Sequence, residues 1–425
     1  MDVDLERVEN VDLCFSAPPS KSYTHRALII AALGNGVSSI VGVLSSDDIS
    51  VTCRVLRSLG VSVEEDEDKS EIRIAGCNGK FPCTGEVVLD CGDSGTTLRL
   101  ITSAAALSDA SVLITGSGRM KERPAGPLVD ALRTLGCGIK YCNEDGYPPF
   151  MVEGPLNGGE TSLDASVSSQ FVSSLLIAAP YAKEQVGIAV EGEAVSQSYL
   201  DITLDVMRKF GVHVVNSGYR HFSVSPGGYS GREYRIEGDY SSASYLFAIA
   251  AVCGGRVVVD NLNPESVQGD LQFLSALEAM GCLVTYYADS VEVVRDRVLR
   301  GIEIDMSSSP DTVQTLCSVA AFAESPTVIS GIEHLRYKES DRIEAIKEML
   351  HNCGAKTEYL DGKLFINPGG VYGCTVDPKN DHRTAMAGAI LGLGAGGVRI
   401  QSAECVSKSF PGFWDILRGA GLWNE

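Results

Sequence analysis

The sequence lacks the patterns that define several common protein classes. It holds 13 cysteines, but they are scattered singly, with no Cys-x-x-Cys pair and no His/Cys cluster at zinc-ligand spacing. No stretch is long and apolar enough to span a membrane, and the acidic N-terminus has no apolar signal-peptide region. We therefore expect no metal and no membrane association. We also expect buried, reduced thiols, which indicates a reducing, cytoplasmic location.

Positive charge is also scarce. The chain has 35 Lys and Arg residues against 55 Asp and Glu residues, which gives a net charge of −20. This balance argues against general nucleic-acid binding, which needs a basic surface. It still allows a small anionic substrate, because a local cluster of cations can override the overall sign.

What the chain does contain is enough apolar sequence for more than one core. It has 425 residues, of which 44% are hydrophobic and 21% charged, as in folded globular proteins. That length favours two domains over one.

A helix end that stops at glycine and leads into an apolar strand recurs six times, at intervals of about 70 residues. Each glycine suits the position just after a helix, where a positive φ is needed. The pattern predicts six α/β units, three in each of two domains that face each other across a cleft. The Gly-rich stretch 227–231 is the predicted crossing between the domains. The six glycines are Gly60, Gly136, Gly211, Gly281, Gly354 and Gly421.

Cations stand at predicted helix starts, where the helix dipole is already positive. Ser340 or a near neighbour is expected to cap a helix, with Lys338, Glu339 and Arg342 in its first turn or just before it. An anionic ligand would suit such a place, although a surface ion-pair cluster is the simpler interpretation of this stretch alone. Ser20 is a similar cap, followed by Lys21 and Arg26.

Further polar groups precede other predicted helices. The amides around Gly95 suit an oxyanion, although a tight turn explains this stretch equally well. Capping explains one of Ser168 and Ser169 but does not need Gln170. Pro310 is predicted at the first position of a helix, beside Asp311.

Taken together, these groups predict an anion site with more than one phosphate or carboxylate to hold. Asp311 and Glu339 are the acids available for proton transfer. The glycines fit neither the Walker nor the Rossmann pattern, and no metal set or phosphate-transfer Asp pair is present, so a kinase or a metallohydrolase is disfavoured. The cations of the predicted site are Lys21, Arg26, Arg123, Arg342, Arg383 and Lys408.

These stretches resemble the motifs of the 5-enolpyruvylshikimate-3-phosphate synthase family, and the resemblance covers the whole chain. The resemblance implies an α/β fold of two similar domains, each built from three βαβαββ units, with the active site in the interdomain cleft. It places residues 15–237 in an N-terminal domain on the shikimate 3-phosphate side. Residues 1–14 and 238–425 form a second domain that clamps phosphoenolpyruvate. The motifs are Ser20-Lys21-Ser22 with Arg26, Gly95-Thr96 with Arg99, residues 119–124, Ser168 to Phe171, Lys338-Glu339 with Asp341-Arg342, residues 380–383, and Lys408.

The resemblance further implies transfer of the enolpyruvyl group of phosphoenolpyruvate to the 5-hydroxyl of shikimate 3-phosphate, without a cofactor and by a monomer. Glu339 and Asp311 are the candidates for proton transfer, with exchangeable roles, and Lys21 assists. The implied shikimate 3-phosphate ligands are Lys21, Ser22, Arg26, Ser168, Ser169, Gln170, Ser196, Asp311, His334 and Lys338. The implied phosphoenolpyruvate ligands are Lys21, Gly95, Arg123, Gln170, Arg342, Arg383 and Lys408.

Three positions depart from the family pattern. Asp93 and His334 stand where many relatives have Asn, and Leu100 stands where Pro is common. None of these removes a charged catalytic group, so they bear on affinity and glyphosate sensitivity more than on the reaction.

Two alternatives remain. One is a UDP-N-acetylglucosamine enolpyruvyl transferase, but that family usually has Cys or Asp where this chain has Gly118. The other is a non-catalytic protein of the same fold, which would be expected to have lost some of the charged set.

Overall fold

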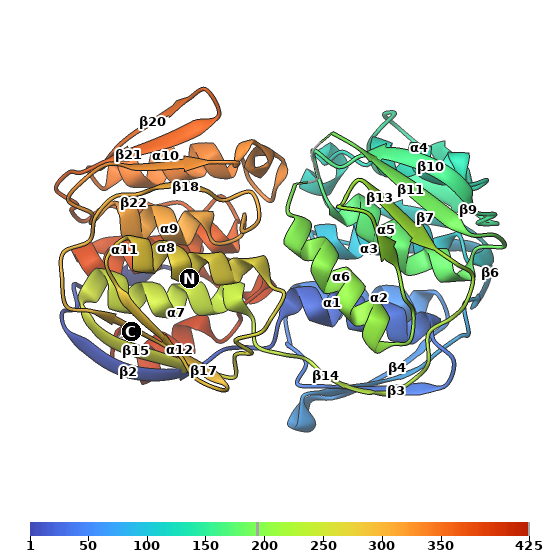
Figure 1. Cartoon of the computed structure of the whole chain (residues 1–425), viewed down its shortest axis with the longest axis horizontal. Helices are drawn as coiled ribbons and strands as arrows, with labels where there is room; N and C mark the ends of the chain where they lie inside the picture. The colour runs from blue at the N-terminus through green and yellow to red at the C-terminus, as the bar shows by residue number, and fades with distance from the viewer. Residues whose placement is uncertain (193–194, 424–425) are drawn as a thin grey trace. The chain divides into compact units, whose positions relative to one another are not determined.

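The structure is a computed structural model that describes residues 1–192 and 195–423. The chain divides into two compact α/β units, each with its own hydrophobic core. Pro19–Ile236 form the N-terminal unit, and Met1–Pro18 with Glu237–Glu425 form the C-terminal unit (Figure 1). Among the described residues, no helix is long and apolar enough to cross a membrane.

One sheet pattern repeats through both units. In the second repeat, β6 (Phe81–Asp90) runs parallel to β7 (Ser108–Thr115), which pairs antiparallel with β9 (Phe150–Glu153) and through it with β8 (Gly138–Tyr141). With α3 (Gly95–Ala105) and α4 (Gly126–Thr134), the order along the chain is βαβαββ. Within the described residues the strands form six sheets, of which five are four-stranded with this pattern and one is three-stranded. The predicted α/β fold with a sixfold repeat is confirmed.

The other elements of the N-terminal unit belong to its first and third repeats. The first repeat holds α1 (Lys21–Leu33), β3 (Val37–Val41), α2 (Asp47–Ser58), β4 (Ser62–Asp66), β5 (Glu71–Ala75) and β14 (Glu233–Arg235). The third holds β10 (Gly159–Asp164), α5 (Gln170–Ala178), β11 (Val186–Glu191), α6 (Gln197–Lys209), β12 (Val215–Asn216) and β13 (His221–Val224). Short 3₁₀ turns lie at Glu67–Lys69, Arg119–Glu122 and Ala179–Tyr181.

The C-terminal unit repeats the scheme. Its first repeat holds β2 (Val11–Ser16), α7 (Tyr240–Cys253), β15 (Gly255–Asp260), α8 (Gln272–Ala279), β16 (Leu283–Tyr286) and β17 (Ser290–Arg295). Its second holds β18 (Glu303–Asp305), α9 (Val313–Ala320), β19 (Thr327–Ser330), α10 (Arg342–Asn352), β20 (Lys356–Leu360) and β21 (Lys363–Asn367). Its third holds β1 (Val3–Leu5), β22 (Thr375–Val376), α11 (His382–Ala395), β23 (Val398–Ile400) and α12 (Phe413–Gly419). The 3₁₀ turns are Gly269–Leu271, Glu333–Tyr337 and Ala403–Lys408.

Two strands come from distant parts of the chain. β2 pairs with β15 and belongs to the C-terminal unit, whereas β14 pairs with β3 and completes a sheet of the N-terminal unit. β14 follows the Gly-rich stretch 227–231 and still pairs with β3. The chain therefore leaves the N-terminal unit after Ile236, a few residues beyond the predicted crossing.

The inner helices are apolar on nearly every face, which is typical of helices buried on all sides. In the N-terminal unit α3 packs against α1 and α5, and in the C-terminal unit α7, α9 and α11 pack against one another. The amphipathic helices α2, α4, α6, α8, α10 and α12 end at the six predicted glycines, which all have φ between 70° and 108°. This periodic feature of the sequence is therefore confirmed.

The expectation that Ser340 or a near neighbour caps a helix is confirmed, because the cap of α10 is Asp341, and its carboxylate accepts from the amides of Ile343 and Glu344. The expectation for Pro310 is wrong. Pro310 does not begin a helix, because α9 starts at Val313; residues 306–312 form a turn held by hydrogen bonds among themselves.

The expectation that all thirteen cysteines are reduced thiols is also wrong. Cys353, just after α10, forms a disulfide with Cys374, which directly precedes β22. Their separation of 21 residues matches no spacing that marks a pair in the sequence. The remaining cysteines are free, and most are buried or half-buried.

Candidate active site

In the C-terminal unit, one buried arginine joins three carboxylates. The side chain of Arg342, the first residue of α10, is only 2% exposed. Its guanidinium donates to Asp311 at 3.0 Å, to Glu339 at 2.8 Å and to Asp381 at 2.9 Å. Burial by itself would lower the pKa of Arg342, but Asp381, Glu339 and Asp311 raise it above its ordinary value. Arg342 is therefore a permanent cation, and it holds both predicted proton-transfer acids.

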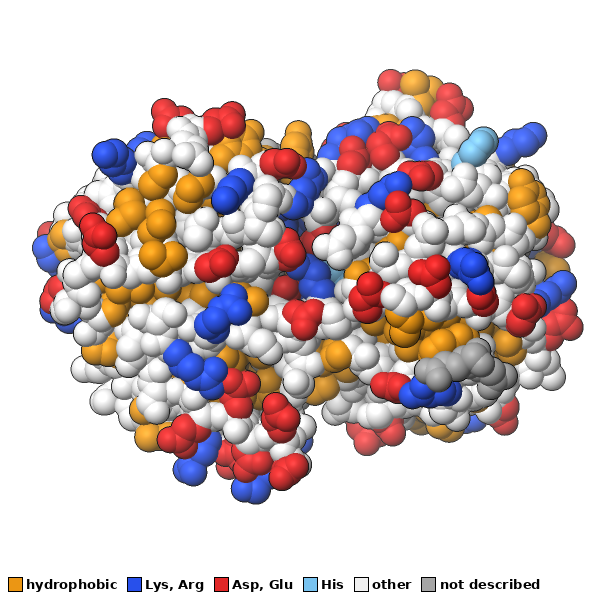
Figure 2. All heavy atoms as spheres, turned by 180° about the vertical axis from the view of Figure 1, so that it is seen from behind, with side chains coloured by type: hydrophobic (Ala, Val, Ile, Leu, Met, Phe, Trp, Pro, Cys, Tyr) orange, Lys and Arg blue, Asp and Glu red, His pale blue; other side chains and the backbone are white. Residues whose placement is uncertain are grey.

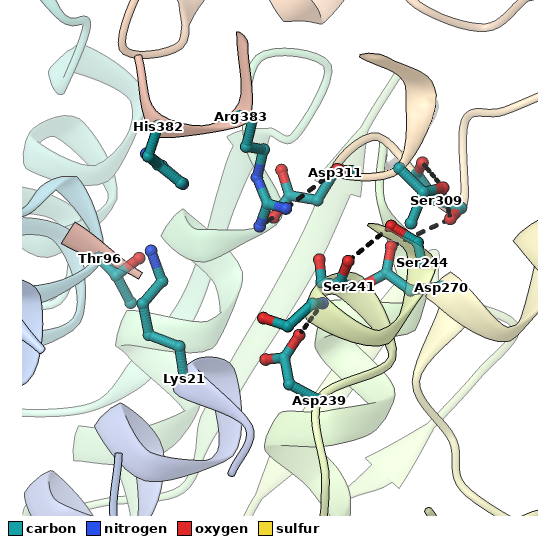
Figure 3. A network of polar contacts seen from close by, with 12 residues as sticks. Lys21, Thr96, Asp239, Ser241, Ser244, Asp270, Ser309, Asp311, His382 and Arg383 are labelled. Carbon is teal, nitrogen blue, oxygen red and sulfur yellow. Dashed lines mark hydrogen bonds and ion pairs between the residues drawn. The ribbon is translucent and has the colours of Figure 1, made fainter. Parts of the chain in front are cut away.

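A second arginine orients Asp311. Arg383, in the first turn of α11, donates from one nitrogen to Asp311 Oδ2 at 2.7 Å and from another to the Asp311 carbonyl at 3.0 Å. Figure 3 shows Arg383 beside Asp311. Asp311 Oδ1 faces Arg342, so each oxygen of the carboxylate contacts a different guanidinium. Charge-assisted hydrogen bonds of this kind are strong, and they also fix the orientation of the carboxylate.

Asp381 anchors both arginines. Its buried carboxylate accepts from Arg342 Nε, from the Ser340 hydroxyl at 3.0 Å and from the Arg383 amide at 3.0 Å. It therefore caps α11 and positions the guanidinium at the start of α10. The cations at both helix starts are therefore paired with protein carboxylates, as the ion-pair interpretation of this stretch expected, although Arg342 is buried and not on the surface. The anion site stays a prediction.

The other predicted residues of this unit lie in or just after 3₁₀ turns. His334 is buried in Glu333–Tyr337, and Lys338 directly follows that turn. Burial and the nearby Lys338 lower the pKa of His334 to about 3, so its imidazole is neutral at physiological pH. Within the described residues, its Nε2 atom has no hydrogen-bond partner. Lys408 is buried at the end of Ala403–Lys408.

In the N-terminal unit, Lys21 begins α1 behind its cap, Ser20. Lys21 Nζ lies 3.0 Å from Asp48 Oδ2, with side-chain exposures of 14% and 5%. Asp48 belongs to the first turn of α2, so a carboxylate at the start of one helix holds a predicted catalytic lysine at the start of another.

Gly95 leaves room for Arg123 at the start of α3. A Cβ atom built on Gly95 would lie 2.4 Å from one terminal nitrogen of Arg123 and 2.8 Å from its Cζ. Only glycine therefore allows the buried guanidinium to stand over this helix start. The combination of free helix amides and a cation suits a bound anion.

A buried arginine also orients the start of α5. Arg99 donates to Ser168 Oγ at 3.0 Å and to Gln170 Oε1 at 3.1 Å. The Gln170 amide nitrogen in turn donates to Thr96 Oγ1 at 3.1 Å. These contacts explain why Gln170 follows the serines, which helix capping left unexplained.

Arg26 is fully buried and contacts the protein with all three nitrogens. They donate to Thr203 Oγ1, to the Ser22 carbonyl and to the Tyr199 carbonyl, at 2.7, 2.9 and 3.1 Å. Burial lowers the pKa of Arg26 to about 10, so it stays charged at neutral pH. Its role as a substrate ligand stays a prediction.

Ser196 has features expected of a ligand-binding residue. It adopts a left-handed conformation with φ 56° just before α6, where its side chain makes no cap. The residue is buried, and its hydroxyl has no hydrogen-bond partner in the part of the chain that the structure describes. An unpaired buried hydroxyl costs stability unless a ligand satisfies it.

Comparison with known proteins decides between the interpretations. Residues 7–417 match the family model described as EPSP synthase (3-phosphoshikimate 1-carboxyvinyltransferase). A 3-phosphoshikimate 1-carboxyvinyltransferase of Methanoculleus marisnigri is 56% identical over 99% of this chain and 100% of its own length. One of Serratia proteamaculans is 39% identical over 97% of each. The chain belongs to the EPSP synthase family.

The fold agrees with this assignment. A solved EPSP synthase structure from Acinetobacter baumannii superposes with a TM-score of 0.83 at 26% identity, and covers 99% of this chain and 98% of that one.

No group of three or more His, Cys, Asp or Glu side chains in the described ranges is arranged to hold a metal ion. On the face that Figure 2 shows, acidic and basic side chains are interspersed over the surface of each unit.

Sequence analysis missed several residues that support the family's site. Asp381 and Arg99 appeared only as parts of motifs, and Asp48 was not singled out. For Asp381 and Arg99, the signal was a charged residue within a few positions of a predicted ligand. Asp48 carries no such signal, because it lies 27 residues from Lys21 in the chain.

Proposed function

We propose that the residues of these clusters bind phosphoenolpyruvate and shikimate 3-phosphate and catalyse the reaction between them. As a member of the EPSP synthase family, the chain transfers the enolpyruvyl group to shikimate 3-phosphate and releases phosphate, in the pathway to chorismate and the aromatic amino acids. The observation that supports the residue roles best is Asp311, whose two carboxylate oxygens contact Arg342 and Arg383.

In this proposal, Asp311 accepts the proton of the 5-hydroxyl as that oxygen attacks C2 of phosphoenolpyruvate. Glu339 supplies a proton to the methylene carbon, which makes C2 electrophilic, and Lys21 stabilises the developing charge. The same acids act in reverse roles when the tetrahedral intermediate loses phosphate. Arg342 supports this chemistry, because it contacts both acids at 3.0 and 2.8 Å.

The ligand roles follow the family likeness. Phosphoenolpyruvate is held by cations at helix starts and by Gln170, which contacts Arg99 and Thr96. Shikimate 3-phosphate is held by four serine hydroxyls together with charged and amide groups, and the unpaired Oγ of Ser196 supports this part of the proposal. The phosphoenolpyruvate set is Lys21, Gly95, Arg123, Gln170, Arg342, Arg383 and Lys408, and the shikimate 3-phosphate set is Lys21, Ser22, Arg26, Ser168, Ser169, Gln170, Ser196, Asp311, His334 and Lys338.

The division of labour between the units, with shikimate 3-phosphate on residues 15–237 and phosphoenolpyruvate clamped by residues 1–14 and 238–425, is part of the same proposal. So are action as a monomer, a cytoplasmic location and independence of cofactors. The match to the EPSP synthase family disfavours both alternatives. The presence of Asp311, Glu339 and the arginines disfavours the non-catalytic one.

The test is phosphate release by purified protein with phosphoenolpyruvate and shikimate 3-phosphate, beside a parallel reaction that holds UDP-N-acetylglucosamine instead. Release only with the shikimate ester is expected. Calorimetry should then show that Asp311→Ala weakens shikimate 3-phosphate binding, while the exposed control Asp415→Ala binds normally. Unchanged affinity in Asp311→Ala would remove Asp311 from the ligand set, and release only with the UDP-sugar would refute the proposed substrate.

A further inference from the structure

Asp270 is a buried carboxylate that the roles above leave without a function. It lies in the 3₁₀ turn Gly269–Leu271 of the C-terminal unit and is 6% exposed. A carboxylate is expensive to bury unless its hydrogen bonds compensate the lost hydration. Its retention in the interior therefore indicates a task that an apolar residue would not perform.

Asp270 holds the turn that carries Asp311. The hydroxyl of Ser309, which is fully buried, donates to Asp270 Oδ1 at 3.0 Å. The same hydroxyl lies 2.7 Å from Thr312 Oγ1, and the Thr312 amide donates to the Ser309 carbonyl at 3.3 Å. Asp311 stands between these two residues, so the contact with Asp270 braces the backbone on which the Asp311 carboxylate is mounted (Figure 3).

The neighbouring residue Gln268 ties the same turn to α7. Its side-chain oxygen accepts from the Tyr240 amide at 3.1 Å, and its nitrogen donates to the Gly238 carbonyl at 2.8 Å. The turn 268–271 is thus fixed at both ends, to the start of α7 and to the turn before α9. A rigid support of this kind can set the position of a catalytic group to a fraction of an ångström.

Asp270 also lies in the electrostatic field of the cluster. The charged groups that act on it are Asp311 from the turn before α9, Arg383 from α11 and Asp239 from the cap of α7. Tyr245 of α7 contacts Arg383, and Arg342 of α10 contacts Asp311. Burial and the carboxylate of Asp311 raise the pKa of Asp270 above that of an ordinary aspartate, with Arg383 opposing them. The protonation of Asp270 is therefore coupled to the charge of Asp311.

We propose that Asp270 is a positioning residue for the enolpyruvyl transfer: by accepting from Ser309 it fixes the orientation of Asp311. The inference rests on the proposed role of Asp311. Its physical cause is the hydrogen bond from the Ser309 hydroxyl to the Asp270 carboxylate.

Two variants test this hydrogen bond. In Asp270→Asn the side-chain oxygen still accepts from Ser309, so we expect kcat to stay close to the wild-type value. In Ser309→Ala the donor is lost while both carboxylates remain, and we expect kcat to fall by about tenfold or more with little change in KM. Neither variant should move the acidic limb of the kcat profile.

The matched control is Asp201→Asn. Asp201 is a half-buried carboxyl of α6 whose pKa is also raised by burial and which accepts from the Tyr219 hydroxyl at 2.7 Å. It is not among the proposed ligands, so its variant should keep both kcat and the position of the limb. Circular dichroism and thermal melting of all three variants report whether each one folds.

A readout without turnover uses ¹³C-carboxyl NMR of aspartate-labelled protein, with the Asp270 signal identified by its absence from Asp270→Asn. The titration midpoint of Asp270 should fall when Asp311 is replaced by Asn, because a negative neighbour is removed. An unchanged midpoint would refute the placement of Asp270 beside Asp311, on which the proposal rests. Normal kcat in Ser309→Ala, or a loss in Asp270→Asn as large as that in Ser309→Ala, would overturn the proposal, even if the variants melt at lower temperature.

Failure of the proposed function has a different signature. Wild-type protein that releases no phosphate, or Asp311→Ala protein that releases it at the normal rate, would refute the assigned role of Asp311 and the inference with it. Wild-type activity that depends on Asp311 but not on Asp270 or Ser309 would refute the inference alone.

Discussion

Replacement of Gly95 by alanine adds a single methyl group where Arg123 stands. The new Cβ would lie 2.4 Å from a terminal nitrogen of Arg123 and 2.8 Å from Cζ. Ordinary contact between such atoms begins near 3.5 Å, so the guanidinium has to retreat by about 1 Å. Because it is the far end of a flexible side chain, it can move without unfolding the helix.

The expected cost falls on phosphoenolpyruvate binding. A hydrogen bond to a charged group contributes about 1.5–3 kcal/mol, and a shift of 1 Å removes most of it. At about 1.4 kcal/mol for each factor of ten, KM for phosphoenolpyruvate should rise by about ten- to hundredfold, while KM for shikimate 3-phosphate changes little. Stability should not fall, because alanine is favoured over glycine in a helix by about 1 kcal/mol.

The assay is initial-rate phosphate release with phosphoenolpyruvate varied at saturating shikimate 3-phosphate. Gly118→Ala is the control, because Gly118 has φ −52° and a Cβ there would meet nothing within 4 Å. In an Arg123→Ala background, Gly95→Ala should add no further loss, since the group that it displaces is gone. An unchanged KM in Gly95→Ala, or a full additional loss in the double variant, would refute the reasoning.

Three further predictions follow from the site and the disulfide. Lys21→Ala and Glu339→Gln should each reduce turnover by at least about a hundredfold with the fold intact, and a near-normal rate in either would remove that residue from the mechanism. For His334, folding lowers the pKa to about 3. The free energy of unfolding therefore decreases as pH falls below the pKa that the histidine has in the unfolded chain. Wild type should lose about 2 kcal/mol more than His334→Asn between pH 6.5 and 5 in urea unfolding, because only the unfolded histidine binds a proton there; equal losses would contradict this. Thiol titration of denatured protein should find fewer reactive cysteines before reduction than after it, since Cys353 and Cys374 are paired; equal counts would refute the pairing.

Local chemistry was readable from the sequence. The six glycines lie at positive φ just after helices, as predicted, because the backbone needs that conformation wherever such a helix ends. Ser20 and Asp239 cap their helices for a similar reason, since a side chain that accepts from the next turn is a short-range interaction. Repetition of these signals was sufficient to give the α/β repeat and, with the motifs, the family.

Only the tertiary structure decided which charges meet. Arg342 gathers Asp311, Glu339 and Asp381, two of which are 31 and 39 residues away along the chain. No spacing rule predicts such a set, because it depends on how α9, α10 and α11 pack. The same holds for the space that Gly95 leaves for Arg123, for the brace between Asp270 and Ser309, and for the disulfide of Cys353. The sequence by itself determined the helices and strands, their repeat and the kinds of group at their ends. Long-range packing determined which of those groups lie within hydrogen-bonding distance of one another. Packing therefore also decides which acids are positioned to move protons.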